Sequence, residues 1–97
     1  MKLKEIRKAI DSVDSELLIL IAKRFELCKR TRRLKNAVVD RTRESHIEAR
    51  WLDAANVLQL NPEFVNDVLR TILTESKALQ SKSDASYLIG RSHESNK

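Results

Sequence analysis

Two cations on one predicted helical face are the first residues of this chain whose types and spacing suggest chemistry. Arg24 interrupts the apolar run LLILIAKRFEL at residues 17–27, and Lys35 follows eleven residues later. In a helix this spacing places both side chains within about 20° of one face and roughly 16 Å apart along the axis. A guanidinium cannot lose its charge in a protein. Two such cations can converge on one small anion held between them.

Arg7 is a third cation on the same segment, seventeen residues before Arg24. That separation corresponds to about 25 Å along a helix, so the two guanidinium groups of one chain cannot hold one small molecule. If Arg7 joins the site, it must come from a second subunit.

Polar residues that could join the same site also occur later in the chain, on the two helices predicted to follow the first one. Ser76 and Gln80 are four residues apart and share a helical face with an apolar stripe, where a buried hydroxyl and carboxamide need hydrogen-bond partners. Asp40, Arg43 and Glu44 cluster where a second helix is predicted to begin. We predict that these side chains and the two cations of the first helix line one pocket.

Each of these residues also has a purely structural explanation. Arg24 could pair with Glu26, Lys35 could be solvated at a helix end, and Ser76 could bond to its own helix. Asp40 could serve only as a helix cap. We favour one shared pocket, because it explains at once why several polar residues interrupt otherwise apolar helix faces.

Other kinds of site find less support. His46 and His93 have no partners at metal-ligand spacing, so we expect no metal and no cofactor. Cys28 is the single cysteine and cannot form an internal disulfide, which favours a reducing, cytoplasmic setting. Because it has no evident base beside it, we interpret Cys28 as a small core residue. The N-terminal residues lack the apolar core of a signal peptide, and no stretch approaches the roughly 18 apolar residues of a membrane span.

The formal charge of +5 suits an anionic partner. The stretch CKRTRRLK carries five cations in eight residues, which is typical of a nucleic-acid-binding patch and equally of a solvated helix face. A basic helical nucleic-acid-binding module is therefore the alternative from another functional class.

Three helices are expected to position these residues. The first runs from Leu3 to about Lys35 without Gly or Pro, with apolar residues at helical spacing. Residues 17–27 read as buried on most of their circumference. A helix of about 50 Å cannot fold back on itself, so its apolar face must meet other helices, most economically those of a second chain.

The remaining helices have clear start signals. Asp40 is predicted to cap a helix that ends near Leu58, and Asn61 to cap a third that has Pro62 in its first position and ends near Gln80. Residues 81–97 are Ser-rich and predicted to be a disordered tail behind a domain of residues 1–80. The expected fold is all-α, an intertwined helical homodimer of three-helix chains, with an irregular monomeric three-helix bundle as the alternative.

Five stretches in this order resemble the all-helical class of chorismate mutases: IRKAIDSVD, LIAKRFEL, RRLK, DRTRE and ESKALQ. The resemblance covers about residues 3–80. The connection NAVV between Lys35 and Asp40 departs from it, because it is short and has no Gly or Pro.

The resemblance implies a site shared between two chains. Arg24 and Arg7 of the partner subunit would hold the two carboxylates of chorismate, and Ser76 would help to seat one of them. Lys35 and Gln80 would donate hydrogen bonds to the ether oxygen whose bond to carbon breaks.

The resemblance also implies that Glu44 and the backbone near Asp40 hold the ring hydroxyl, with Arg43 alongside. The reaction would be the Claisen-type rearrangement of chorismate to prephenate, a step toward phenylalanine and tyrosine. This rearrangement needs no nucleophile, metal or general base. A lyase that removes pyruvate from isochorismate shares the fold and is the nearest rival, disfavoured because Glu44 is present.

Overall fold

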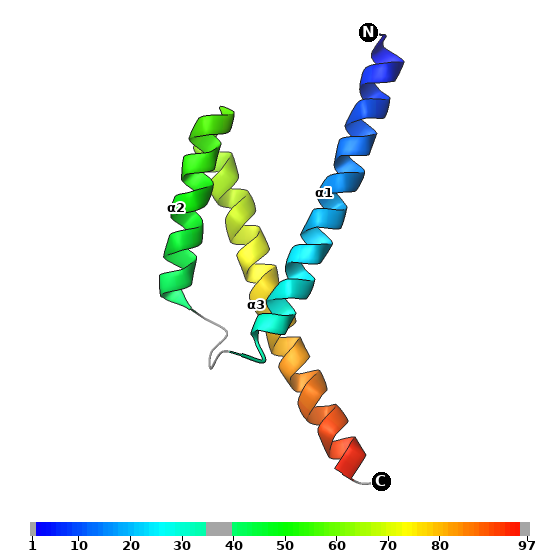
Figure 1. Ribbon diagram of the computed structural model, residues 1–97, viewed down its shortest axis with the longest axis vertical. Coiled ribbons are helices and arrows are strands. Elements are labelled where there is room, and N and C mark those ends of the chain that lie inside the picture. The colour runs from blue at the N-terminus through cyan, green and yellow to red at the C-terminus, as the bar shows by residue number, and fades with distance from the viewer. Residues whose placement is uncertain (1, 35–39, 96–97) are drawn as a thin grey trace.

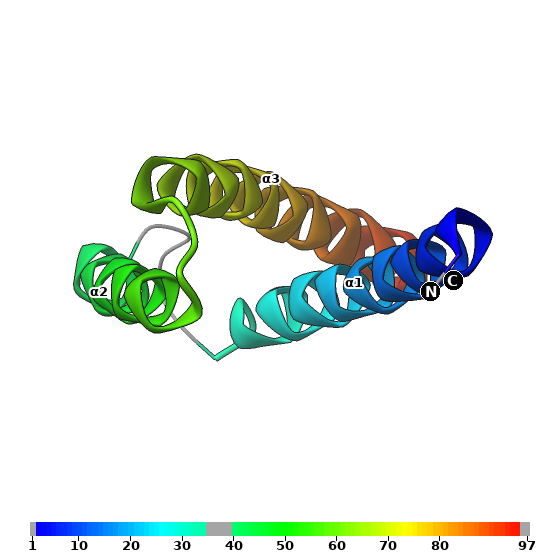
Figure 2. The same cartoon turned by 90° about the horizontal axis from the view of Figure 1, so that it is seen from above.

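In the computed structural model the chain forms three helices: α1 (Leu3–Thr31), α2 (Arg41–Leu58) and α3 (Pro62–Ser95). The structure describes the backbone of residues 2–34 and 40–95 and the side chains of residues 2–34 and 40–82. The helix α3 packs against both of the others. The C-terminal part of α1 crosses α3, and the N-terminal part of α1 extends away from it (Figure 1, Figure 2). The predicted all-α class with a long first helix is confirmed.

Two predicted helix starts are confirmed in atomic detail. The side chain of Asp40 accepts a hydrogen bond from the Arg43 backbone N–H at 3.0 Å, and that of Asn61 accepts one from the Glu63 N–H at 3.0 Å. Each bond satisfies one of the amide groups that a helix N-terminus leaves without a carbonyl partner. The caps therefore fix where α2 and α3 begin.

The helix α2 ends at Leu58 as predicted, but the ends of α1 and α3 differ from the predictions. The helix α1 stops at Thr31, before Lys35, and α3 continues to Ser95, well past the predicted end near Gln80. The second error arose because we took a scarcity of apolar residues as a stop signal, whereas an existing helix gains one hydrogen bond for each residue added. The division into a domain of residues 1–80 and a tail of residues 81–97 stays a prediction. Lys35 and the connection 36–39 lie outside the described residues.

The small core is built mainly by α2 and α3. Its buried apolar residues are Ile47, Ala55, Val65, Leu69 and Ile72. The helix α1 contributes no buried residue to it. The expected burial of residues 17–27 is therefore wrong within one chain.

The apolar residues of α1 remain in contact with solvent in a single chain. Six of them are between 41% and 61% exposed: Leu3, Ile6, Ile10, Val13, Leu17 and Leu20. A series of large exposed aliphatic residues along one helix marks a surface that binds another protein segment. None of the described helices is both long and apolar enough to cross a bilayer.

Leu69 provides a test of the core, because it is only 2% exposed. We expect Leu69→Ala to lower the free energy of unfolding by about 2–5 kcal/mol, through lost burial and the cavity left behind. Urea unfolding at one fixed protein concentration measures this change. The control is Val57→Ala, because Val57 is 79% exposed and its truncation should change stability by less than about 0.5 kcal/mol. Equal effects of the two substitutions would contradict the assignment of the core.

Candidate functional site

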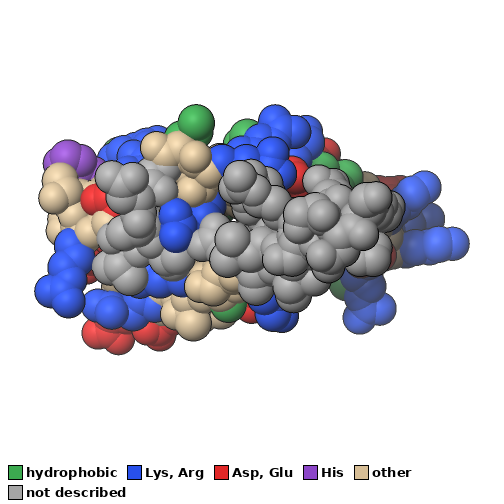
Figure 3. Space-filling view, turned by 90° about the horizontal axis from the view of Figure 1, so that it is seen from below, with side chains coloured by type: hydrophobic (Ala, Val, Ile, Leu, Met, Phe, Trp, Pro, Cys, Tyr) green, Lys and Arg blue, Asp and Glu red, His purple; other side chains and the backbone are tan. Residues whose placement is uncertain are grey.

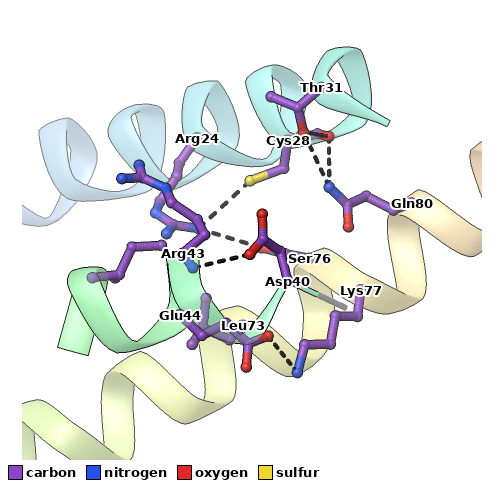
Figure 4. Close-up of a pocket in the computed structure, with 11 residues that line it drawn as sticks. Arg24, Cys28, Thr31, Asp40, Arg43, Glu44, Leu73, Ser76, Lys77 and Gln80 are labelled. Atoms are coloured by element: carbon purple, nitrogen blue, oxygen red, sulfur yellow. Dashed lines mark hydrogen bonds and ion pairs between the residues drawn. The ribbon is translucent and has the colours of Figure 1, made fainter. Parts of the chain in front are cut away.

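A pocket of about 300 Å³ lies between the C-terminal end of α1, the first turns of α2 and the middle of α3 (Figure 4). All of its lining residues except Ile47 and Leu73 carry a polar or charged side-chain group. The lining residues are Arg24, Cys28, Thr31, Asp40, Arg43, Glu44, Ile47, Leu73, Ser76, Lys77 and Gln80. Three segments far apart in the sequence thus bring their polar residues to one hollow.

Arg24 is half-buried and has neutral partners. Its Nη1 donates to the Ser76 hydroxyl at 3.4 Å and to the Cys28 sulfur at 3.7 Å. The alternative pairing with Glu26 does not occur, because Glu26 forms an ion pair with Lys29 at 3.0 Å. Within the described residues no carboxylate lies within ion-pair distance of Arg24. A half-buried permanent charge without a counter-charge favours binding of an anion.

Gln80 joins α3 to the last turn of α1. Its side-chain amide nitrogen donates to the Cys28 carbonyl oxygen at 2.8 Å and to the Thr31 hydroxyl at 3.3 Å. The Cys28 carbonyl belongs to the last turn of α1 and also accepts a hydrogen bond from the Thr31 hydroxyl at 2.8 Å. Since a carboxamide has two N–H groups, a ligand that replaces the longer bond to Thr31 would leave the shorter one in place.

The first turn of α2 brings charges of both signs to the pocket. Asp40 caps the helix and also lines the pocket beside Arg43. Glu44 is half-buried, and its Oε1 lies 2.7 Å from the Nζ of Lys77 on α3. A pair this exposed typically adds only about 0.2–1 kcal/mol to stability.

The pocket holds six of the eight residues predicted for the site: Arg24, Asp40, Arg43, Glu44, Ser76 and Gln80. Arg7 is exposed on the distant N-terminal half of α1 and is not among the lining residues. Lys35 lies outside the described residues.

Three polar lining residues escaped the sequence analysis. Cys28 was interpreted as a small core residue, although it follows Arg24 by one helical turn and shares its face. Thr31 lies on the same face one turn further on, so the same periodicity could have identified it. Lys77 follows Leu73 by four residues, which places both on one face of α3. Among the described side chains no cluster of His, Cys, Asp and Glu could hold a metal ion.

The chorismate mutase type II family matches residues 6–81, which is most of the chain. This chain belongs to that family. It is also 35% identical over 79 residues to a T-protein from Enterobacter agglomerans, an alignment that covers 77% of this chain. The chain spans about a fifth of that relative, 21% of its length. No solved structure matches the chain significantly.

The link from Gln80 to α1 yields a prediction about stability. Gln80→Leu preserves the approximate size of the side chain but removes one of the two donors to the Cys28 carbonyl, the other being the Thr31 hydroxyl. This loss should lower the free energy of unfolding by about 0.5–1.5 kcal/mol. Gln80→Glu should be at least as destabilising, since a carboxylate oxygen would then face that carbonyl. Urea unfolding measures both. Gln59→Leu is the control, because Gln59 is exposed at the end of α2. Wild-type stability of both Gln80 variants would show that the link is unimportant.

Proposed function

We propose that this chain catalyses the rearrangement of chorismate to prephenate. One observation carries the proposal: the guanidinium of Arg24 meets only neutral described partners, in a pocket whose buried polar side chains include Ser76 and Gln80. A small dianion supplies the missing negative charge. Family membership identifies which dianion to test first.

The two carboxylates of the substrate are assigned to arginines. Arg24 binds one of them, with the nearby Ser76 hydroxyl as a second donor. Arg7 of the partner subunit binds the other, because Arg7 and Arg24 of one chain are about 25 Å apart along α1. Fixed cations at both ends of a flexible dianion select the compact conformer in which the reacting carbons approach each other.

We assign to Gln80 and Lys35 the role of stabilising the negative charge that develops on the ether oxygen. Negative charge grows on this oxygen as its bond to carbon breaks, so donors aimed at it stabilise the transition state more than the ground state. Loss of one such donor typically costs about 2.7–4 kcal/mol of activation free energy. The role of Gln80 is supported by its side-chain amide, which lines the pocket as a hydrogen-bond donor. The role of Lys35 rests on the resemblance to the family.

The ring hydroxyl is assigned to the first turn of α2. Glu44 is half-buried at the pocket, and carboxylate oxygens accept hydrogen bonds. In this assignment the ring hydroxyl donates a hydrogen bond to the Glu44 carboxylate. The backbone near Asp40 is the second contact, and Arg43 lies beside it. The presence of this acceptor favours the mutase over the lyase that has the same fold and removes pyruvate from isochorismate.

We also propose a cytoplasmic homodimer with two shared sites. The exposed apolar residues of α1 recur at alternating intervals of three and four, and Arg24 continues the series. Such a repeat is typical of helices that pack along their length against another helix. A second α1 lying antiparallel along this face would bring its Arg7 toward the pocket of the first chain. The monomeric bundle leaves this face uncovered.

The nucleic-acid-binding alternative finds less support. On the face shown in Figure 3, Lys and Arg side chains are spread out with acidic side chains among them. Lys29, within the basic stretch, is paired with Glu26. Retention on DNA at moderate salt, without turnover of chorismate, is the result expected of that alternative.

The direct test follows the disappearance of chorismate with purified protein. Wild-type protein should form prephenate, and Lys35→Ala should reduce turnover by a factor of about 10² or more without a change in thermal stability, because one donor to the ether oxygen is lost. The matched control is Lys82→Ala, which removes an exposed lysine near the pocket. Wild-type turnover by Lys35→Ala would remove Lys35 from the site.

Mixed dimers test whether the site is shared. Arg7→Ala and Arg24→Ala chains should each be inactive alone. If the chains are mixed and refolded, the heterodimer contains one intact site and one doubly damaged site, so activity should return to as much as a quarter of the wild-type value for a statistical mixture. Heterodimers that form, as shown by differential tagging, but remain inactive would exclude a shared site.

A further inference from the structure

The pocket contains a charged pair to which the proposed function gives no role. Glu44 and Lys77 are thirty-three residues apart in the sequence, yet their charged groups meet at 2.7 Å (Figure 4). Both side chains line the pocket, and the pair links the first turn of α2 to the middle of α3. Lys77 also lies directly after Ser76 and three residues before Gln80. It is therefore placed among the residues assigned to the substrate.

We propose that Lys77 is a positioning residue that holds the Glu44 carboxylate where it accepts the hydrogen bond of the substrate's ring hydroxyl. The inference rests on the proposed function, in which Glu44 is that acceptor. Lys77 acts through Glu44 and is not a catalytic residue. It makes the pocket selective for a substrate with a hydroxyl donor at this place on the ring.

The number of hydrogen bonds that a carboxylate can accept makes both contacts compatible. An ionised carboxylate has about four acceptor positions on its two oxygens. Lys77 uses Oε1 of Glu44, and no described residue uses the other oxygen. The ring hydroxyl can therefore bind while the ion pair remains in place, so substrate and lysine need not compete.

The mobility of Glu44 explains why such a partner matters. A glutamate has three rotatable side-chain bonds, and with 28% of its side chain exposed Glu44 has space to turn toward solvent. A charge-assisted hydrogen bond is short and directional, so the ammonium restricts where the carboxylate lies before substrate arrives. Positioning an acceptor in advance lowers the entropy lost on binding.

The pair adds little to folding, because both groups are partly exposed to solvent. Its loss should therefore appear in recognition of the substrate rather than in stability. A hydrogen bond to the ring hydroxyl is present in both the bound substrate and the transition state, so its loss raises KM more than it lowers kcat.

The experiment compares Lys77→Met with wild type on two substrates, chorismate and a chorismate analogue whose ring hydroxyl carries a methyl group. We expect Lys77→Met to lose about tenfold in kcat/KM for chorismate, chiefly through KM, and less than twofold for the methylated analogue. Lys77→Arg should regain most of the loss, since it restores the positive charge. In a Glu44→Gln background, Lys77→Met should have no further effect.

The control is Lys29→Met, which breaks an ion pair of similar length outside the pocket, between Lys29 and Glu26. There the hydrogen bond and charge of Lys29 lower the pKa of the exposed Glu26 carboxyl. This substitution should leave the kinetics on both substrates unchanged. Circular dichroism and thermal unfolding establish that each variant is folded.

Three results would overturn the inference: unchanged kinetics of Lys77→Met on chorismate, an increase in its kcat/KM, or an equal loss on both substrates. An increase would mean that Lys77 competes with the hydroxyl for Glu44. Since the wild-type protein is measured first, a failed proposed function appears as no turnover by wild type. A failed inference appears as turnover by wild type with an unexpected result for Lys77→Met.

Discussion

The permanent charge of Arg24 is the constraint on which the site depends. A guanidinium cannot be neutralised by losing its proton, so a half-buried one needs an anion or continued access to water. Within the described residues this chain offers it a hydroxyl and a thiol, while the nearby Glu26 is paired with Lys29. In the proposed enzyme the substrate supplies the missing anion. The planar group can hold a carboxylate through two parallel hydrogen bonds, which a lysine cannot do.

The length of α1 relates the fold to the site. A helix of 29 residues extends about 43 Å, and only its C-terminal part meets α3 in one chain (Figure 1). The face that carries Arg24 at one end carries exposed aliphatic residues at the other. In the proposed dimer, a second chain that covers those residues also completes the pocket. In the proposed dimer, stability of the assembly and affinity for substrate both increase when the two α1 helices associate.

Local signals predicted the parts of this structure that depend on local chemistry. The caps at Asp40 and Asn61 follow from side chains that bond to amides two or three residues away, and the periodicity of α1 identified Arg24 as an exception. The end of α3 was missed, because helix propagation does not require an apolar face. The Glu44–Lys77 pair was missed because it joins different helices, and sequence spacing carries no information about which helices become neighbours.

The described lining of the pocket carries a small net positive charge. The described lining holds the cations Arg24, Arg43 and Lys77 and the anions Asp40 and Glu44, which leaves one positive charge in excess. Lys77 and Asp40 are already engaged, by Glu44 and by the N-terminus of α2 respectively. A doubly negative substrate therefore meets less positive charge than it carries negative charge. In the proposed enzyme Lys35 of the same chain supplies the second positive charge, and Arg7 of the partner subunit adds a third, placed at the carboxylate that Arg24 cannot reach.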